Sequence, residues 1–160
     1  MFKKILIANR GEIAVRIIRA CRELGVKTVS VHSNSDSEAM HVKLADESIC
    51  IGESNAASSY LNIPNILSAA TITGSDAVHP GYGFLSENEK FSEILSKYKI
   101  KFIGPSPESI FSLGNKNNAL KIAKKFNIPI LGSGEDSTIT SVDEAKIFAK
   151  KFKFPIVIKA

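Results

Sequence analysis

Short apolar runs alternate with amphipathic stretches along the first hundred residues. Residues 4–8 (KILIA) form an apolar run, which is typical of a strand buried on both faces. Apolar side chains then recur at helical spacing from residue 11 to residue 24, and Gly25 is placed to end that helix. Further strands are expected at 28–32, 48–51, 77–79 and 101–103, and helices at 63–73 and 89–98. This alternation predicts an α/β fold of the Rossmann-like type, with a mostly parallel sheet.

The pattern changes after Pro107. Helices are expected at 108–113 and 117–126, and Ser141 with Glu144 three residues later predicts the start of another helix. Residues 155–159 form a last apolar strand, which nothing later in this chain pairs with or covers. We therefore expect an α/β domain over residues 1–114 and the beginning of a second, truncated domain over residues 115–160.

Composition and charge narrow the class of protein. The chain has 160 residues, is 44% hydrophobic and has a net charge of +5, and the whole excess of basic residues lies after residue 80. Those lysines interleave with apolar residues and are joined by no cluster of arginine or aromatic residues. They favour solvated helix faces, or a local field for an anionic small molecule, over a nucleic-acid surface. No apolar run is long enough for a membrane helix or a secretory leader, so we expect a cytoplasmic protein.

The two cysteines, Cys21 and Cys50, lack the spacing of metal ligands. They are expected to be small buried residues in a reducing compartment. No metal site is predicted within this chain.

The turn after the first strand argues against dinucleotide binding. It reads Asn9-Arg10-Gly11-Glu12 and has a single glycine, whereas a pyrophosphate-binding turn needs the pattern G-x-G-x-x-G. The Glu12 carboxylate would also lie near the bound anion. A Rossmann-like sheet without NAD is therefore expected.

The most informative segment is residues 79–88, HPGYGFLSEN, which follows a predicted strand. Ligands of open α/β sheets gather beyond the carboxyl ends of the strands, and two glycines and a proline indicate an unusual backbone path. The candidate site residues here are His79, Tyr82, Gly83 and Glu87. The alternative is a structural loop in which Ser86 or Asn88 caps the next helix and His79 is a satisfied, half-buried imidazole.

Two lysines are candidates for binding phosphate. Lys159 ends the apolar run 156–158, so its ammonium group would leave the sheet and enter a crevice. Lys116 stands at the start of a predicted helix. For both residues the alternative is an exposed, solvated side chain.

The sequence resembles the N-terminal part of the biotin carboxylases, the ATP-grasp subunits or domains of acetyl-CoA, propionyl-CoA and pyruvate carboxylases. The matching segments occur in the same order along essentially the whole chain. They are residues 4–14 (KILIANRGEIA), 59–64 (SYLNIP), 79–88, 102–105 (FIGP) and 155–160 (PIVIKA). The resemblance implies a pre-ATP-grasp domain followed by the first elements of an ATP-grasp domain.

The resemblance also implies an activity for the complete protein: bicarbonate is joined to the ureido nitrogen of carrier-bound biotin, through carboxyphosphate, at the expense of MgATP. Lys116 and Lys159 are then expected to contact ATP, and Tyr82 and Gly83 to lie near the biotin end of the site. Arg19 and Glu23 resemble the family's dimer contact, although they could also form a surface i,i+4 ion pair.

Further expectations follow from the family. The partners would be a biotin carboxyl carrier protein, a carboxyltransferase subunit or domain, and a second copy of the chain. The Mg²⁺ ligands and the catalytic residues belong after residue 160, so the chain alone should lack turnover. Asn115 stands where the family usually has aspartate, and nucleotide binding is expected to survive that change. The alternative function is a stand-alone nucleotide-binding, phosphate-binding or dimerisation module without catalysis.

Overall fold

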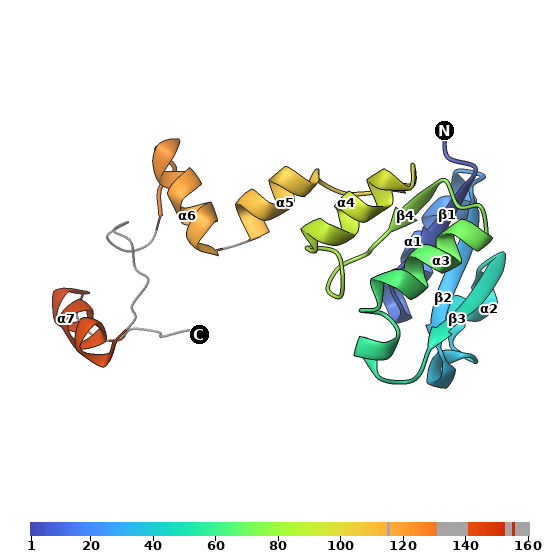
Figure 1. The fold of residues 1–160 in the computed structure, drawn as a ribbon, viewed down its shortest axis with the longest axis horizontal. Coiled ribbons are helices and arrows are strands. Elements are labelled where there is room, and N and C mark those ends of the chain that lie inside the picture. Colours follow the sequence, from blue (N-terminus) through green and yellow to red (C-terminus); the bar gives the residue numbers. More distant parts are fainter. Residues whose placement is uncertain (115, 131–140, 153–154, 156–160) are drawn as a thin grey trace. The chain divides into compact units, whose positions relative to one another are not determined.

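A computed structural model describes residues 1–114, 116–130, 141–152 and 155. The chain divides into two compact units, Met1–Phe111 and Ser112–Ala160. In Figure 1 the first unit contains the sheet, and the second contains the later helices.

The first unit is built on one five-stranded sheet whose strands are all parallel. The strands are β1 (Lys4–Ile7), β2 (Lys27–Ser33), β3 (Glu47–Gly52), β4 (Ala77–His79) and β5 (Lys101–Phe102). Their order across the sheet is β3-β2-β1-β4-β5. The chain therefore winds one way from β1 to β3 and the other way through β4 to β5, as in a doubly wound fold. The predicted α/β class with a mostly parallel sheet is confirmed.

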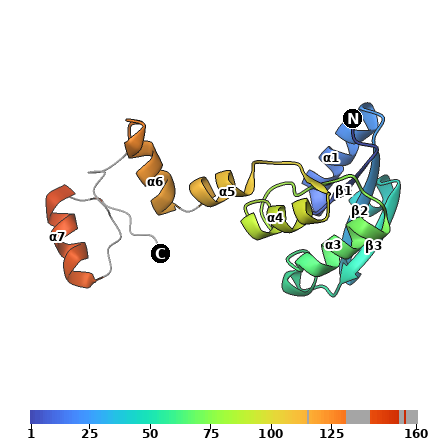
Figure 2. The same cartoon turned by 45° about the horizontal axis from the view of Figure 1, so that its top comes forward.

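Helices cover both faces of the sheet, on opposite sides in Figures 1 and 2. The helices of this unit are α1 (Gly11–Glu23), α2 (Met40–Leu44), α3 (Ile63–Ile72) and α4 (Glu89–Lys97), and α5 (Pro107–Gly114) begins in it. Two 3₁₀ turns, Asn34–Asp36 and Ala56–Ser58, complete it. The short helix α2 was not predicted from the sequence.

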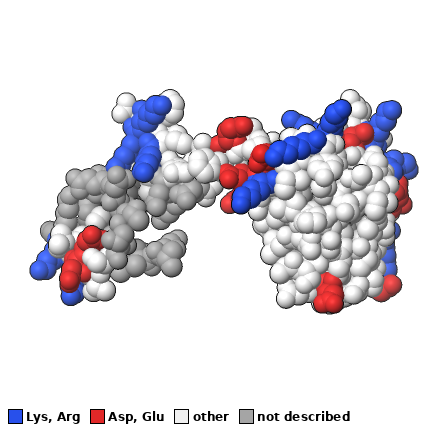
Figure 3. All heavy atoms as spheres, in the orientation of Figure 1, with Lys and Arg blue, Asp and Glu red and all other residues white. Residues whose placement is uncertain are grey.

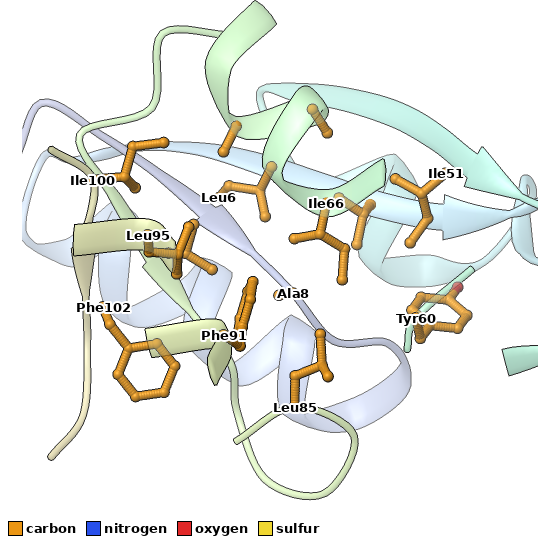
Figure 4. Close-up of a cluster of buried hydrophobic side chains, with 14 of the residues drawn as sticks. Leu6, Ala8, Ile51, Tyr60, Ile66, Leu85, Phe91, Leu95, Ile100 and Phe102 are labelled. Carbon is orange, nitrogen blue, oxygen red and sulfur yellow. The ribbon is translucent and has the colours of Figure 1, made fainter. Parts of the chain in front are cut away.

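Two apolar cores hold these layers together. On one face, Ile5 and Ile7 of β1 pack with Ile17 and Ile18 of α1. On the other face, the larger cluster joins Leu6 and further strand residues to α3 and α4, as Figure 4 shows. Successive residues of β1 thus point to opposite faces, and both faces are buried, which explains why this strand is apolar without alternation.

The ends of the helices follow the predicted residues. Gly25 has φ +68°, a left-handed conformation that ends α1, and the amide of Val26 donates to the carbonyl of Cys21 at 2.8 Å. Asn88 caps α4, because its Oδ1 accepts a hydrogen bond from the amide of Phe91 at 2.9 Å. This confirms one part of the structural alternative for residues 79–88.

The second unit contains α6 (Lys116–Lys125) and α7 (Val142–Phe152). The Ser141 hydroxyl accepts a hydrogen bond from the amide of Glu144 at 3.2 Å, so the predicted cap of α7 is present. Of the strand expected at 155–159, only Pro155 lies within the described residues. None of the helices in the described part of the chain is both long and apolar enough to span a membrane.

Candidate functional site

The polar groups of the first unit gather where three strands of the sheet end. Asn9 and Arg10 follow β1, Asp36 follows β2, and the 79–88 segment begins at the end of β4. Because all strands are parallel, these three places lie at the same edge of the sheet. In a doubly wound fold, a ligand would enter this edge between the strands where the winding reverses, here β1 and β4.

The side chain of Asn9 occupies the place between these two strands. Its Nδ2 donates to the carbonyl oxygens of Pro80, at 2.7 Å, and Tyr82, at 2.8 Å. Its Oδ1 accepts from the amide of Arg10 at 2.8 Å, so all the polar hydrogens and the oxygen of the amide group are used. Asn9 is only 3% exposed. A hydrogen-bonded side chain thus lies between the ends of β1 and β4, where a doubly wound fold places its ligand.

The backbone of the 79–88 segment takes the unusual path that its glycines indicate. Gly81, Gly83 and Phe84 have φ of +65°, +67° and +40°, and the last is a rare conformation for a side chain of that size. The ring of Phe84 stacks on that of Tyr60 with centroids 5.1 Å apart, which helps to hold this conformation.

His79 makes a hydrogen bond within its own loop. It is half-buried, and its Nδ1 accepts a hydrogen bond from the amide of Gly81 at 3.0 Å. Burial lowers the pKa of His79 below its ordinary value, because the charged ring would lose solvation. The ring is thus neutral, with its proton on Nε2, and it fixes the turn that leads to Tyr82.

Tyr82 is exposed, with 57% of its surface accessible. Its hydroxyl donates to Oε1 of Glu12, in the first turn of α1, and this hydrogen bond raises the pKa of Tyr82. The Glu12 charge raises this pKa further, whereas the charge of Arg16 lowers it. Glu12, which the sequence marks only as unfavourable for a bound anion, is therefore the direct partner of a candidate site residue.

A second polar network lies beside the segment, and sequence reasoning missed it. Asp36 accepts from Arg10 Nη2 at 2.8 Å and from the Tyr60 hydroxyl at 2.6 Å, and Tyr60 in turn accepts from the amide of Ser33 at 3.0 Å. Burial alone would raise the pKa of Asp36. The hydrogen bonds from Tyr60 and Ser33 and the charge of Arg10 outweigh that effect and leave it below its ordinary value. This network connects the ends of β1 and β2 to Tyr60, on whose ring Phe84 stacks.

The other two candidate residues of this segment, Gly83 and Glu87, are exposed to solvent. Glu87 is exposed and has no hydrogen bond or ion pair among the described residues. A Cβ on Gly83 would meet no atom within 4 Å. Residues 54–75 and 77–86 contain no Lys, Arg, Asp or Glu, and Figure 3 shows one broad face of this unit on which few charged side chains are seen.

Arg19 and Glu23 lie exposed on α1. Within the described part of the chain they form no ion pair with each other. The surface ion pair considered as an alternative is thus not formed in this structure, and both side chains are exposed.

Two further sequence predictions concern residues outside the 79–88 segment: the phosphate-binding lysines and the absence of a metal site. Lys116 is the first residue of α6, but its side chain lies outside the described residues, as do Asn115 and Lys159. Among the described residues, no group of three or more histidine, cysteine or carboxylate side chains is placed to hold a metal ion. Of the two cysteines, Cys21 is buried as predicted, but Cys50 is exposed, because it lies on β3 at the edge of the sheet. The prediction that Cys50 is buried is therefore wrong.

Comparison with known proteins identifies relatives over the whole chain. Residues 1–110 match the family model described as biotin carboxylase, N-terminal domain. Biotin carboxylase 1 of Bacillus subtilis is 51% identical over 160 residues, which are 100% of this chain and 35% of the relative. The chain thus spans about a third of the length of the curated relatives that it matches.

Solved structures give the same picture. The biotin carboxylase of Campylobacter jejuni, in complex with β-γ-ATP, has a TM-score of 0.90 and 45% identity, over 97% of this chain and 34% of that one. The biotin carboxylase domain of the 2-oxoglutarate carboxylase of Hydrogenobacter thermophilus has a TM-score of 0.89 and 44% identity, over 97% and 34%. That domain was solved as a dimer in complex with MgADP, ADP and bicarbonate.

Proposed function

The chain belongs to the biotin carboxylase family, and on that premise we propose that it is the N-terminal segment of an ATP-dependent biotin carboxylase. The complete protein would carboxylate carrier-bound biotin with bicarbonate and ATP. The observation that supports this most is the 51% identity to a biotin carboxylase over the full length of the chain. The relatives include the carboxylase of 2-oxoglutarate, so the proposal is confined to the carboxylation of biotin and does not name the final acceptor.

The proposed reaction divides the work between two parts of the chain. Bicarbonate is a poor electrophile, and phosphorylation to carboxyphosphate activates it, with ATP as the phosphoryl donor. Such a transfer depends on positioning and on neutralising the charge of the moving phosphoryl group. Lys116 and Lys159 are proposed to oppose the phosphates of ATP. Mg²⁺ would be held by residues after 160 and would supply further neutralisation of the phosphate charge. The 115–160 part would thus be the beginning of an ATP-grasp domain.

The 79–88 segment is proposed to contact the carrier-bound biotin. Residues 77–86 contain no charged side chain, and the carboxylate of Glu12 beside Tyr82 disfavours an anion, whereas Tyr82 offers an exposed hydroxyl oxygen. Carrier-bound biotin presents a neutral ureido ring, which suits such a surface. Residues His79 and Gly83 then serve to shape the backbone around Tyr82.

The partners follow from the same proposal. A biotin carboxyl carrier protein would deliver the substrate, and a carboxyltransferase subunit or domain would take the carboxyl group onward. Arg19 and Glu23, exposed and not paired with each other in this structure, are proposed to face a second copy of the chain. A cytoplasmic location is part of the proposal.

The experiment is an ATP-binding and turnover assay on the full-length protein that contains residues 1–160. Lys116→Ala and Lys159→Ala should each weaken ATP binding at least tenfold in calorimetric titration, since each removes a charge opposite phosphate. Lys124→Ala, a change of the same kind on α6, should leave the affinity unchanged. Unchanged affinity in both site variants would reject the ATP assignment, and a lack of biotin-stimulated ATP cleavage in the wild type would reject the proposed function.

A further inference from the structure

We propose that Glu12 is a positioning residue that holds the Tyr82 hydroxyl so that its oxygen accepts a hydrogen bond from an N–H group of the biotin ureido ring. The inference rests on the proposed function, which brings biotin to this segment. It goes beyond that function in giving a role to Glu12 and in assigning the direction of one hydrogen bond to the substrate.

The end of β1 and the start of α1 hold Tyr82 at two points. Asn9, just after β1, donates to the Tyr82 carbonyl at 2.8 Å and thereby fixes the backbone. Glu12, in the first turn of α1, accepts from the hydroxyl and thereby fixes the far end of the side chain. An exposed tyrosine would otherwise rotate about its two side-chain torsions, so these contacts order the phenol before a substrate arrives.

The Glu12 contact also decides what the phenol can bind. A tyrosine hydroxyl has one hydrogen to donate and lone pairs that accept. Because the hydrogen is directed to Glu12, the oxygen faces a ligand as an acceptor only. Phosphate groups and bicarbonate present mainly acceptor oxygens, which this arrangement repels. A ureido ring has two N–H donors, and either of them can donate a hydrogen bond to the phenol oxygen.

The electrostatics of the pair point the same way. The hydrogen bond to Glu12 keeps the pKa of Tyr82 above its ordinary value, so the phenol stays protonated at neutral pH and the oxygen is that of a neutral hydroxyl. The negative charge of Glu12 acts on the hydroxyl more strongly than the opposing positive charge of Arg16, and it adds to the discrimination against anions. Glu12 thus favours the neutral substrate over the anionic ones at this end of the site.

The test uses the full-length protein, with free biotin as carboxyl acceptor and ATP cleavage as the readout. Glu12→Ala should raise KM for biotin about five- to tenfold, the effect of one lost neutral hydrogen bond. KM for ATP and the bicarbonate-dependent ATP cleavage without biotin should not change. Glu12→Gln should restore most of the affinity, because its side-chain carbonyl still accepts from the phenol. Glu89→Ala removes a glutamate from the first turn of α4 and serves as the matched control.

A double-mutant cycle separates this role from a structural one. If Glu12 acts through Tyr82, Glu12→Ala should have no further effect in a Tyr82→Phe background. Additive effects, or an equal loss of the biotin-independent ATP cleavage, would overturn the inference, as would an unchanged KM for biotin in Glu12→Ala. These outcomes require an active wild type. A wild type without biotin-stimulated cleavage instead rejects the proposed function, and the inference with it.

Discussion

Asn9 and Gly81 lie so close that a Cβ built on Gly81 would stand 2.8 Å from Nδ2 of Asn9. The two residues are separated by most of the first unit in sequence, yet the amide group fits only because position 81 has no side chain. Gly81 also has φ +65°, which L residues with a side chain rarely adopt. The contact therefore sets two independent demands for glycine at one position.

The double demand predicts that Gly81→Ala destabilises the first unit more than Gly83→Ala. Gly83 has almost the same φ but open space around it, so alanine there should cost about 1–2 kcal/mol for the backbone alone. At Gly81 the clash with Asn9 should add about 1–3 kcal/mol. Urea unfolding followed by circular dichroism measures both. Equal losses would show that the contact with Asn9 does not matter.

Asn9→Asp should destabilise the unit by at least ~2 kcal/mol at pH 7, because a carboxylate would face two carbonyl oxygens in place of two donated hydrogen bonds. The loss should shrink as the pH falls, since a protonated carboxyl group regains a donor. Asn65→Asp is the matched control. The Nδ2 of Asn65 donates one hydrogen bond, to the carbonyl of Ile51 at 2.8 Å. Asn65 lies in the first turn of α3, where an acidic side chain is favourable. A smaller loss in Asn9→Asp than in Asn65→Asp would contradict the role of the buried amide.

Tyr60→Phe should cost about 1–3 kcal/mol, since it removes the donor to Asp36 and the acceptor for the Ser33 amide inside the protein. The pKa of Asp36 should rise, which carboxyl chemical shifts measured by NMR would show. In the wild type, the lowered pKa of Asp36 stabilises the folded state when the pH is above about 3.9, the pKa of aspartate in the unfolded chain. This stabilisation is lost as the pH falls through the pKa of Asp36 in the folded protein. The acid dependence should therefore be shallower in the variant.

Tyr98→Phe is the control for this prediction. Tyr98 is 59% exposed, and the same loss of a hydroxyl there should leave both stability and the Asp36 shift unchanged. A Tyr60→Phe protein with the wild-type Asp36 titration would mean that the hydrogen bond contributes little to this carboxyl group.

Stability should fall as the pH drops below about 6.5, the ordinary histidine value. Burial lowers the pKa of both His79 and His41, so the unfolded chain binds protons that the folded chain does not. His79→Asn keeps an acceptor for the Gly81 amide without the titration, and it should flatten part of this dependence. His79→Asn with His41→Gln should remove most of it. A histidine titration by NMR that places His79 at or above 6.5 would contradict the prediction.

The sequence predicts the sheet and most of the helices because local patterns dictate them. The apolar run at 4–8 and the β-branched residues at 28–32 have few alternatives to buried strands, and Gly25 ends α1 through its own conformational freedom. The helix α2 was missed because it has five residues, too few for a periodic pattern to appear. The start of α7 at Ser141 was predictable because the cap and its partner are three residues apart.

The site was only partly predictable, because its contacts join residues far apart in the chain. The glycines of residues 79–88 indicate an unusual loop, but nothing in the sequence pairs Tyr82 with Glu12, 70 positions earlier. Asp36 and Tyr60 likewise come from separate loops and meet only when β2 and the segment before α3 pack together. Asn9 had one visible signal: a polar side chain directly after a buried strand, at the edge where such sheets bind ligands.

The hydrogen-bonded Asn9 side chain between the ends of β1 and β4 affects how a ligand could approach this part of the first unit. A cofactor could enter between these two strand ends only if the hydrogen bonds of Asn9 were broken. Tyr82 is exposed outside these strand ends, so a flat ring on a long tether could bind there from solvent and dissociate again. An exposed contact of this kind suits a ligand that is bound briefly better than one that is held permanently.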